Sequence, residues 1–347
     1  MKSKTTTKNI LQYKLILVLL CVFGTLSIRA QDKTSIYNIV VAQDGSGDYT
    51  KIQDAINAVP NNSSERTVIF IKPGIYKEKL LVPSEKKKVT FLGESYKTTI
   101  LTYDDHGKIT SDYASTKILA EDFFAKNITF QNTIDSRKGG SQAAALRIDA
   151  DRAILYKCNI TGFQDTFYLK TNTRSYIKDC IIDGTTDFIY GAGIALFENC
   201  IIRNRKDSHI TASNQELGKS KFGFIFKNCS IIKYPGEDVS NASLGRPWGN
   251  GAHTVYLNCS IGNHIKPEGF APWSTKPDHK YFNNINTAYY GVYRGSGYHP
   301  ENLLSVVHIL DDTLAAKYTK KNIFAANSTT ANKLIGDWNP IIEKTNK

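Results

Sequence analysis

A short frame containing one cysteine recurs along the chain and restricts its fold more than any other feature. In five such frames the cysteine is followed by Asn-Ile, Ile-Ile or Ser-Ile, and these five cysteines stand 22, 20, 29 and 30 residues apart. Repeats of this length, built from short β-branched runs and Gly, Asn or Asp turns, are typical of stacked solenoids. The sequence therefore predicts an all-β fold, a right-handed parallel β-helix. The five frames are centred on Cys158, Cys180, Cys200, Cys229 and Cys259.

The cysteines themselves are expected to form an interior ladder. Equivalent residues of successive coils stack about 4.8 Å apart, the ordinary distance between strands. An odd number of cysteines in β-rich repeats favours small buried thiols, with disulfide bonds as the alternative in an exported chain. Residues 126–130 resemble an earlier copy, in which Asn127 would occupy the cysteine position.

Both ends of a solenoid expose strand edges and need caps. At the N-terminal end, residues 50–53 resemble a capping box, and an apolar face precedes Pro60, which predicts a short capping helix. From about Leu303 the apolar spacing becomes helical again and predicts a helical C-terminal tail that packs along the barrel or closes its far end. The positions behind these two predictions are Ile52, Ala55, Ile56 and Val59, and Leu304, Val307, Leu310, Leu314 and Tyr318.

Residues 1–30 read as a secretory signal peptide. Lysines precede an apolar run from Leu15 to Ile28, which is shorter than the roughly 20 residues of a membrane-spanning helix. Cleavage is expected after Ala30 or Gln31, which leaves one β-helix domain over residues 31–347. The protein is thus expected to be secreted or periplasmic, without stable membrane insertion. Cys21, inside the run, leaves a lipid anchor as the less favoured alternative.

The chain carries 44 Lys and Arg against 32 Asp and Glu, a formal net charge of +12. Five of these positive charges lie in residues 1–30, so the mature chain has a net charge of about +7. A moderate positive charge serves solubility or attracts a polyanion such as nucleic acid, an anionic surface or an acidic polysaccharide. Charge alone does not choose among these partners.

The 22-residue period also relates polar residues that can do chemistry. Gln142 and Gln164 are 22 residues apart, and so are Asp165 and Asp187. If the coils keep their register, two amides and two carboxylates meet on one face, each pair about one rung apart. Two neighbouring carboxylates do not both ionise easily, so one is expected to hold a proton while the other stays charged.

Such a set resembles an acyl-transfer site built without serine. Uncharged amide N–H donors suit an oxyanion hole, and the two carboxyl groups supply an acid and a nucleophile or base. The alternative is that Asp and Gln recur because turns favour them. The aromatic neighbours of the acids weigh against that alternative, and we expect Phe163 and Phe188 to contact the substrate.

Four motifs, with their order and spacing, carry a family resemblance over nearly the whole mature chain. The sequence resembles the pectin methylesterase (pectinesterase) family of carbohydrate esterases, which implies a right-handed parallel β-helix. The motifs are Gly74-Ile75-Tyr76-Lys77-Glu78, Gly162-Phe163-Gln164-Asp165-Thr166, Asp187-Phe188-Ile189-Tyr190-Gly191 and Leu244-Gly245-Arg246-Pro247-Trp248.

The resemblance implies a role for each matching residue. Asp187 would be the nucleophile, and Asp165 the general acid and then the general base. Gln142 and Gln164 match the family's oxyanion-stabilising amides. Arg246 matches the arginine that pairs with the nucleophile, where a guanidinium lowers the pKa of the carboxyl group and orients it. Trp248 matches an aromatic residue that packs on the sugar.

The implied reaction is hydrolysis of C6 methyl esters of galacturonate units in pectin, which yields free carboxylate and methanol. Neither a cofactor nor a metal is expected. The implied partner is methylated homogalacturonan rather than nucleic acid. The protein is expected to be a monomer. The sequence departs from the family motif Asp-Phe-Ile-Phe-Gly-Asn at two positions: Tyr190 stands in place of the second Phe and Ala192 in place of Asn. It departs again at Phe270, where the family usually has Trp.

Two rival functions stay open at this point. A pectate lyase or polygalacturonase can also use a parallel β-helix, and a lyase would need a basic cluster such as Arg203, Arg205 and Lys206. A solenoid that binds pectin without activity is the other rival. The expected complete set of acids, amides and Arg246 argues against it.

Overall fold

The computed structural model describes residues 37–107, 113–297, 301, 303–326, 334 and 336–342. Residues from Tyr37 onward form one compact unit. The proposed signal peptide and its cleavage site lie outside the described residues. No helix among the described residues is long and apolar enough to cross a membrane.

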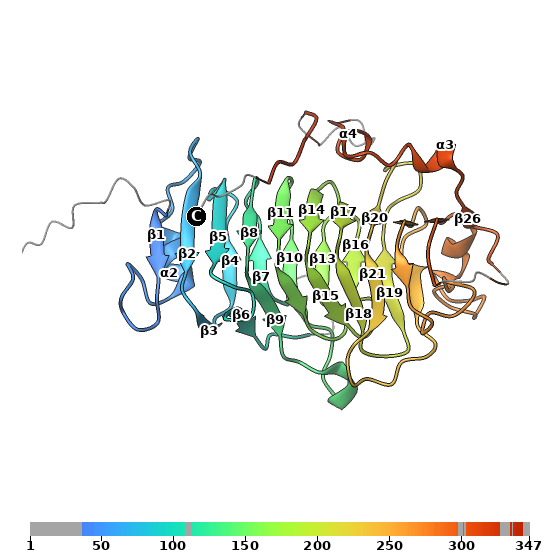
Figure 1. The fold of residues 1–347 in the computed structure, drawn as a ribbon, viewed down its shortest axis with the longest axis horizontal. Helices are drawn as coiled ribbons and strands as arrows, with labels where there is room; N and C mark the ends of the chain where they lie inside the picture. The colour runs from blue at the N-terminus through green and yellow to red at the C-terminus, as the bar shows by residue number, and fades with distance from the viewer. Residues whose placement is uncertain are drawn as a thin grey trace, which may run out of the picture. The chain divides into compact units, whose positions relative to one another are not determined.

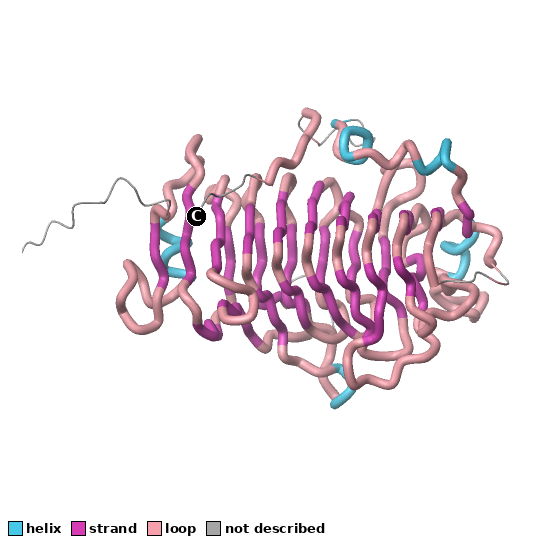
Figure 2. The backbone as a smooth tube through the Cα atoms, viewed as in Figure 1, coloured by secondary structure: helices cyan, strands magenta, loops and turns pink. Residues whose placement is uncertain are grey.

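Three parallel sheets form the body of the molecule, and each regular coil contributes one strand to each sheet (Figures 1 and 2). The fold is the right-handed parallel β-helix that the sequence predicts. Sheet A, with eleven strands, contains β1 (Ile39–Val41), β2 (Thr67–Ile71), β5 (Val89–Gly93), β8 (Phe124–Lys126), β11 (Ala153–Tyr156), β14 (Arg174–Lys178), β17 (Ile194–Glu198), β20 (Phe224–Lys227), β23 (His253–Leu257), β25 (Tyr289–Tyr293) and β26 (Val307–Ile309).

The other two sheets are shorter. Sheet B contains β3 (Gly74–Lys77), β6 (Thr99–Tyr103), β9 (Thr129–Asn132), β12 (Asn159–Thr161), β15 (Ile181–Gly184), β18 (Ile201–Asn204), β21 (Ser230–Lys233) and β24 (Ser260–Ile261). Sheet C contains β4 (Leu80–Val82), β7 (Ala114–Ile118), β10 (Ala144–Ile148), β13 (Phe167–Leu169), β16 (Ile189–Gly191), β19 (His209–Ser213) and β22 (Ser243–Pro247).

Stacked side chains fill the interior, and the predicted cysteine ladder is confirmed. All five cysteines are free thiols and almost fully buried. The Cys158 N–H lies 3.3 Å from the Cys180 sulfur, so neighbouring rungs touch. The alignment of the earlier copy was wrong by one residue: Asn159 pairs with Thr129, which places Ile128 in the cysteine position. Asn127 instead precedes it in the left-handed conformation (φ 59°).

The N-terminal cap is the predicted helix, α2 (Ile52–Ala58), whose Ile52, Ala55 and Ile56 are buried. The predicted capping box is wrong, because no side chain of the helix start caps it. The Glu78 carboxylate instead accepts hydrogen bonds from the Ile52 and Gln53 N–H groups, at 2.9 and 3.1 Å. A carboxylate at the helix start satisfies these orphan donors and suits the helix dipole.

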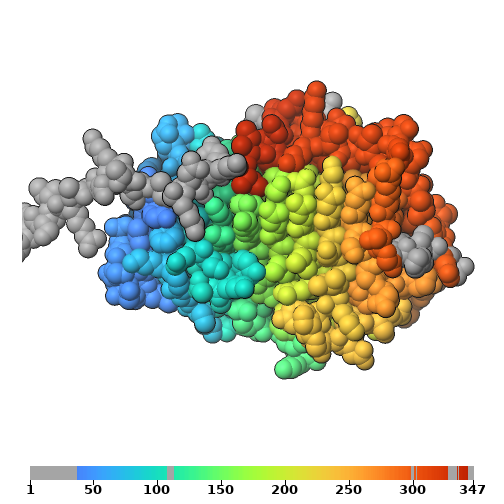
Figure 3. Space-filling model, in the orientation of Figure 1, coloured from blue at the N-terminus to red at the C-terminus, as the bar shows by residue number. Residues whose placement is uncertain are grey.

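The C-terminal tail contains two one-turn helices, α3 (Asp312–Ala315) and α4 (Lys320–Ile323). Its first part is not helical as the spacing had predicted, because residues 307–309 add strand β26 to sheet A. The tail then packs along the barrel, as predicted. In Figure 3 the red C-terminal segment lies against the green and yellow coils. Tail residues Tyr318 and Phe324 share a buried cluster with outward residues of sheet A.

Candidate active site

The four polar residues related by the 22-residue period all lie where the chain turns from sheet B into sheet C. Gln142 precedes β10, Gln164 and Asp165 precede β13, and Asp187 precedes β16. Parallel strands of successive coils bring these turns to the same edge of sheet C. The register of β13 and β16 pairs Phe167 with Ile189, which aligns Asp165 with Asp187 one rung away.

The amide pair keeps the same 22-residue register through an irregular stretch. The Ala143 N–H donates to the Gln164 carbonyl at 3.2 Å, which aligns Gln142 with Gln164. Two residues later the register becomes 21, because Ala145 and Leu146 both donate to the Thr166 carbonyl, at 2.8 and 3.3 Å. Two donors on one carbonyl mark a β-bulge. The bulge lies just after the amide pair, so it leaves that pair aligned.

Both acids adopt the left-handed backbone conformation, with φ of 63° for Asp165 and 49° for Asp187. Asp tolerates this conformation better than most residues, and such backbone clusters at functional sites. Their N–H groups are tied to the next coil, at 3.0 Å to Thr186 and 2.8 Å to His209 carbonyls. The two carboxyl groups are thus held by the ladder and not by a free loop.

Asp187 forms a bidentate pair with Arg246 of β22. The Arg246 Nε donates to Asp187 Oδ1 at 2.9 Å and its Nη2 to Oδ2 at 2.5 Å. Burial raises the pKa of Asp187, and the guanidinium counteracts that rise. The expectation of a lowered pKa was wrong, because desolvation of this 5% exposed residue is the larger effect. The pair still fixes the orientation of both oxygens.

Asp165 is in a different environment, although it is equally buried at 4% exposure. No side chain or backbone group of the described residues donates a hydrogen bond to its carboxyl oxygens. Burial and the Asp187 charge raise the pKa of Asp165 well above its ordinary value, and Arg246 offsets only part of this. The proton shared by the two acids therefore belongs on Asp165, and the negative charge belongs on Asp187.

The two amides are free to serve a ligand. Gln142 and Gln164 are half-buried. Within the described residues, neither side-chain amide makes a hydrogen bond to the protein. Their N–H donors therefore lie beside the acids without a competing acceptor.

One of the two predicted phenylalanine contacts to the sugar is corrected by the structure. Phe188 is completely buried in the hydrophobic core, because it turns inward next to Asp187. Phe163 is half-buried, and its ring lies between two guanidinium groups, 5.1 Å from Arg137 and 5.3 Å from Arg205. Phe188 cannot touch a substrate. Phe163 stays a predicted substrate contact.

Trp248 lies two residues after Arg246, the partner of Asp187. It is half-buried at the end of β22, and its ring stacks with Trp273 at 6.5 Å between centroids. Trp273 in turn covers the Arg246 guanidinium at 4.0 Å. One indole thus covers the guanidinium of the charged pair and a second stacks on the first, an arrangement that suits sugar stacking next to this pair.

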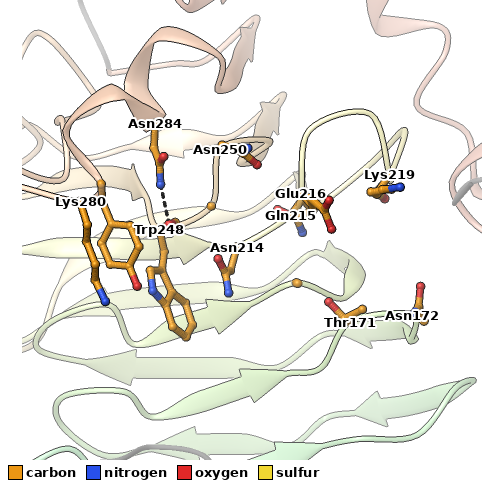
Figure 4. Close-up of a pocket in the computed structure, with 14 residues that line it drawn as sticks. Thr171, Asn172, Asn214, Gln215, Glu216, Lys219, Trp248, Asn250, Lys280 and Asn284 are labelled. Atoms are coloured by element: carbon orange, nitrogen blue, oxygen red, sulfur yellow. Dashed lines mark hydrogen bonds between the residues drawn. The ribbon is translucent and has the colours of Figure 1, made fainter. Parts of the chain in front are cut away.

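A cavity of about 620 Å³ continues from Trp248 along the ends of the sheet C strands (Figure 4). Its walls come from turns that follow β13, β16, β19 and β22 and from the 3₁₀ segment Phe282–Asn286 with the residues before it. The lining is rich in carboxamides and hydroxyls, with a few charges of both signs. It includes Thr171, Asn172, Asn214, Glu216, Lys219, Trp248, Asn250, Lys280, Tyr281 and Asn284.

Sequence reasoning missed three residues of this face. Arg147, Tyr168 and Tyr190 occupy matching positions on β10, β13 and β16. The Arg147 guanidinium lies 4.6 Å from the Tyr168 ring, and the Tyr168 and Tyr190 rings are 4.9 Å apart. The signal was present, because each residue lies three positions after an acid or five after an amide. From the sequence, Tyr168 and Tyr190 count among the aromatic neighbours of the acids, and no prediction is made for Arg147.

The basic cluster that a lyase would need is engaged elsewhere. Arg203 and Arg205 donate to the two oxygens of Asp183, at 2.6 and 2.7 Å, and Asp183 is fully buried. No group of three or more His, Cys, Asp or Glu side chains in the described part of the chain is arranged to hold a metal ion.

Comparison with known proteins places these residues in a family. The Pectinesterase family model matches residues 38–327. Pectinesterase 4 of Arabidopsis thaliana is 36% identical over 258 residues, which cover 70% of this chain and 43% of the relative. A pectinesterase of Daucus carota is 35% identical over 279 residues, which cover 77% of this chain and 85% of the relative. The chain spans less than half the length of the Arabidopsis relative.

Solved structures show the same fold. Pectin methylesterase from carrot superposes with a TM-score of 0.77 at 32% identity, covering 84% of this chain and 94% of that one. A pectin methylesterase from Erwinia chrysanthemi gives 0.72 at 27% identity, covering 89% of this chain and 100% of that one. With the family model matching most of its length, the chain belongs to the pectinesterase family.

Proposed function

We propose that this protein is a pectin methylesterase that uses Asp187 as its nucleophile. The observation that carries the proposal is the difference between its two aligned acids. Asp187 is clamped by Arg246 in a bidentate pair, whereas Asp165 is buried without a hydrogen-bond partner among the described residues and holds the proton. One charged and one protonated carboxyl group, side by side, are what acylation by a carboxylate and protonation of the leaving group require.

In the first step an Asp187 oxygen attacks the C6 carbonyl carbon of a methyl-esterified galacturonate unit. The carbonyl oxygen becomes an oxyanion, for which the Gln142 and Gln164 amides are the available donors. The bond to the methoxy oxygen then breaks, and Asp165 gives its proton to that oxygen. Methanol leaves, and an anhydride joins Asp187 to the sugar.

In the second step Asp165, now a carboxylate, takes a proton from water. The hydroxide equivalent attacks the anhydride at the sugar carbonyl carbon, and the bond to Asp187 breaks. The product is a free galacturonate carboxylate, Asp187 regains its charge, and Asp165 is protonated again. No other acid or base is needed to balance the cycle.

Methylated pectin is the proposed substrate. A related pectin methylesterase, 28% identical with a TM-score of 0.71, was solved in complex with a hexasaccharide. Here the indoles of Trp248 and Trp273 and the carboxamide-rich cavity beside them provide stacking faces and hydrogen-bonding groups for a sugar chain. The positive net charge suits a polymer that becomes more anionic with each turnover.

The rival functions find less support. Of the basic cluster that a lyase would need, Arg203 and Arg205 are bound to Asp183, and Lys206 is an exposed side chain. A binding solenoid would need neither a protonated buried acid nor two unengaged amides beside it. Polar groups without partners in a folded protein carry a free-energy penalty, and a reaction accounts for them.

Incubation of the mature protein with highly methylated pectin tests the proposal. We expect methanol release with no change in chain length and no unsaturated ends. Shortened chains or unsaturated ends with little methanol would show a depolymerase instead, and binding without any product would show an inactive solenoid.

We further propose that residues 1–30 direct export to the periplasm or outside the cell, and that residues 31–347 act as one monomeric domain. The charged start, apolar run and polar end of the leader support export. Secretion of a reporter fused to residues 1–35 tests the first part. Light scattering of the mature protein tests the second, and a mass near twice that of the chain would contradict it.

A further inference from the structure

One buried hydroxyl group on the active-site face has no partner. Tyr190 is 2% exposed, and its hydroxyl is sealed from solvent without a hydrogen bond to any described residue. Its ring is held between Tyr168, at 4.9 Å, and Trp248, at 6.2 Å. A buried hydroxyl without a partner costs about 1–3 kcal/mol, so its retention calls for a reason.

Because the hydroxyl is sealed, it acts through a protein neighbour and not on the substrate. The ladder pairs Tyr190 with Tyr168, which lies three residues after Asp165, so the hydroxyl is on the same stretch of sheet C as that acid. The groups whose charge acts on the Tyr190 hydroxyl are Asp165, Tyr168, Arg147 and Asp149. Arg147 can only donate hydrogen bonds. Asp149 already accepts two bonds from Arg147, at 2.7 and 2.8 Å. Among the described residues near this hydroxyl, Asp165 is the carboxyl group to which nothing donates.

We propose that Tyr190 is a positioning residue whose hydroxyl donates a hydrogen bond to the Asp165 carboxylate once that group has given its proton to the leaving methanol. In the resting enzyme Asp165 is protonated, and no hydrogen bond joins it to the Tyr190 hydroxyl. After proton transfer the Asp165 carboxylate is negatively charged and accepts a hydrogen bond from the Tyr190 hydroxyl. The proposal rests on the proposed function, because it assigns a partner to the acid of that reaction.

This role makes Asp165 a stronger acid than burial alone would allow. Besides Tyr190, the charges that face Asp165 are Asp187, which raises its pKa, and Arg246, which lowers it. A hydrogen bond to the carboxylate favours the charged form and lowers the pKa further. The tyrosine stays a donor throughout, because burial and Asp165 raise the pKa of Tyr190 well above its ordinary value.

The test is the pH dependence of kcat/KM for methanol release by Tyr190→Phe. The alkaline limb reports loss of the Asp165 proton. Without the hydroxyl the carboxylate is less stable, so the alkaline limb should move up by about one pH unit and the plateau should fall about five- to tenfold. The family pattern has Phe at this position, so the variant should fold, with a Tm no lower than that of the wild type.

Tyr290→Phe is the matched control. It removes another fully buried hydroxyl without a partner among the described residues, but the charge that faces it is Asp187. Its alkaline limb should stay at the wild-type pH. Direct ¹³C NMR titration of the Asp165 carboxyl group gives a second reading that does not depend on turnover, and we expect the Tyr190→Phe signal to titrate at higher pH.

The possible failures are distinguishable. If the wild type releases no methanol from pectin, the proposed function fails. If the wild type is active but the alkaline limbs of Tyr190→Phe and wild type coincide within about 0.2 pH unit, Tyr190 has no role at Asp165. A lowered Tm with an unchanged pH profile would show that the hydroxyl only supports the fold.

Discussion

Two bidentate Asp–Arg pairs lie on different faces of the solenoid and have different surroundings. On sheet C, Arg246 clamps Asp187. On sheet A, Arg174 clamps Asp151 in the same way, with Nε to Oδ1 at 3.0 Å and Nη2 to Oδ2 at 2.6 Å. The two pairs have the same chemistry at their contact. What surrounds each pair decides whether it holds the structure or reacts.

The pair on sheet A is fully engaged. Arg174 is completely buried, and its Nη1 donates to the carbonyls of Phe324 and Gly336 in the tail, at 2.7 and 2.8 Å. Tail residues cover the outward apolar side chains of the sheet around it. Among the described residues, no tail side chain shares a buried cluster with the acids of sheet C, and a second carboxyl group stands one rung from Asp187. In the proposed function this second acid, and not the Asp–Arg contact itself, makes the carboxylate of Asp187 useful for catalysis.

The largest effect expected is on Asp187. Asp187→Asn should lower kcat by at least about 10³-fold, because the amide is not a nucleophile, while unfolding stays cooperative. Asp151→Asn, the same change on the other face, should leave kcat within about twofold. Methanol release and circular dichroism measure both. Comparable losses of kcat in the two variants would erase the distinction between the faces.

Substitution of Arg174 should have the opposite result: a loss of stability with little loss of activity. Arg174→Met removes the partner of a buried carboxylate and two bonds to the tail, and breaking such a pair costs about 3–5 kcal/mol. Urea unfolding should show this loss, and limited proteolysis should release the tail, with kcat/KM of the remaining folded protein nearly unchanged. Arg246→Lys is the matching change on sheet C, because it keeps the positive charge but loses the bidentate contact to the two oxygens of Asp187. Activity lost through Arg174 with stability intact would contradict the assignment.

The amides should affect rate and not stability. Removing one oxyanion donor typically lowers kcat by about 10²–10³-fold, and we expect this range for Gln142→Ala and for Gln164→Ala. Because neither side chain bonds the protein in the described structure, the free energy of unfolding should hardly change. Rates from methanol release and urea midpoints check both statements. A variant with raised KM and unchanged kcat would show a binding residue instead.

The smallest effect expected is on the pH dependence of stability. The pKa of Asp165 is raised in the folded state, so the folded protein holds a proton that the unfolded chain loses. Stability from this group is fully present below the unfolded pKa of about 4 and is lost as the pH rises through the folded pKa. Asp165→Asn should therefore unfold at a higher urea concentration than wild type at neutral pH, although it is inactive. An equal or lower midpoint would contradict the burial argument.

Regular spacing was enough to predict the parts of the molecule that repeat. The cysteine ladder and the alignment of Asp165 with Asp187 follow from strands that keep their register. The direction in which Phe188 points did not follow, because the left-handed turn at Asp187 breaks the alternation of the strand. Contacts between segments far apart in the chain could not be predicted from the spacing either. Glu78 caps a helix 26 residues earlier, and Arg174 holds a carbonyl 150 residues later.

The most direct test of the account is to trap the bond to Asp187. An aryl ester of a galacturonate oligosaccharide has a leaving group that needs no proton, so Asp165→Asn should still be acylated. Without a base to activate water, the acyl-enzyme should accumulate, and mass spectrometry of the quenched protein should locate the added galacturonyl mass on Asp187. A stable adduct on any other residue, or burst-free turnover with no adduct, would contradict Asp187 as the nucleophile.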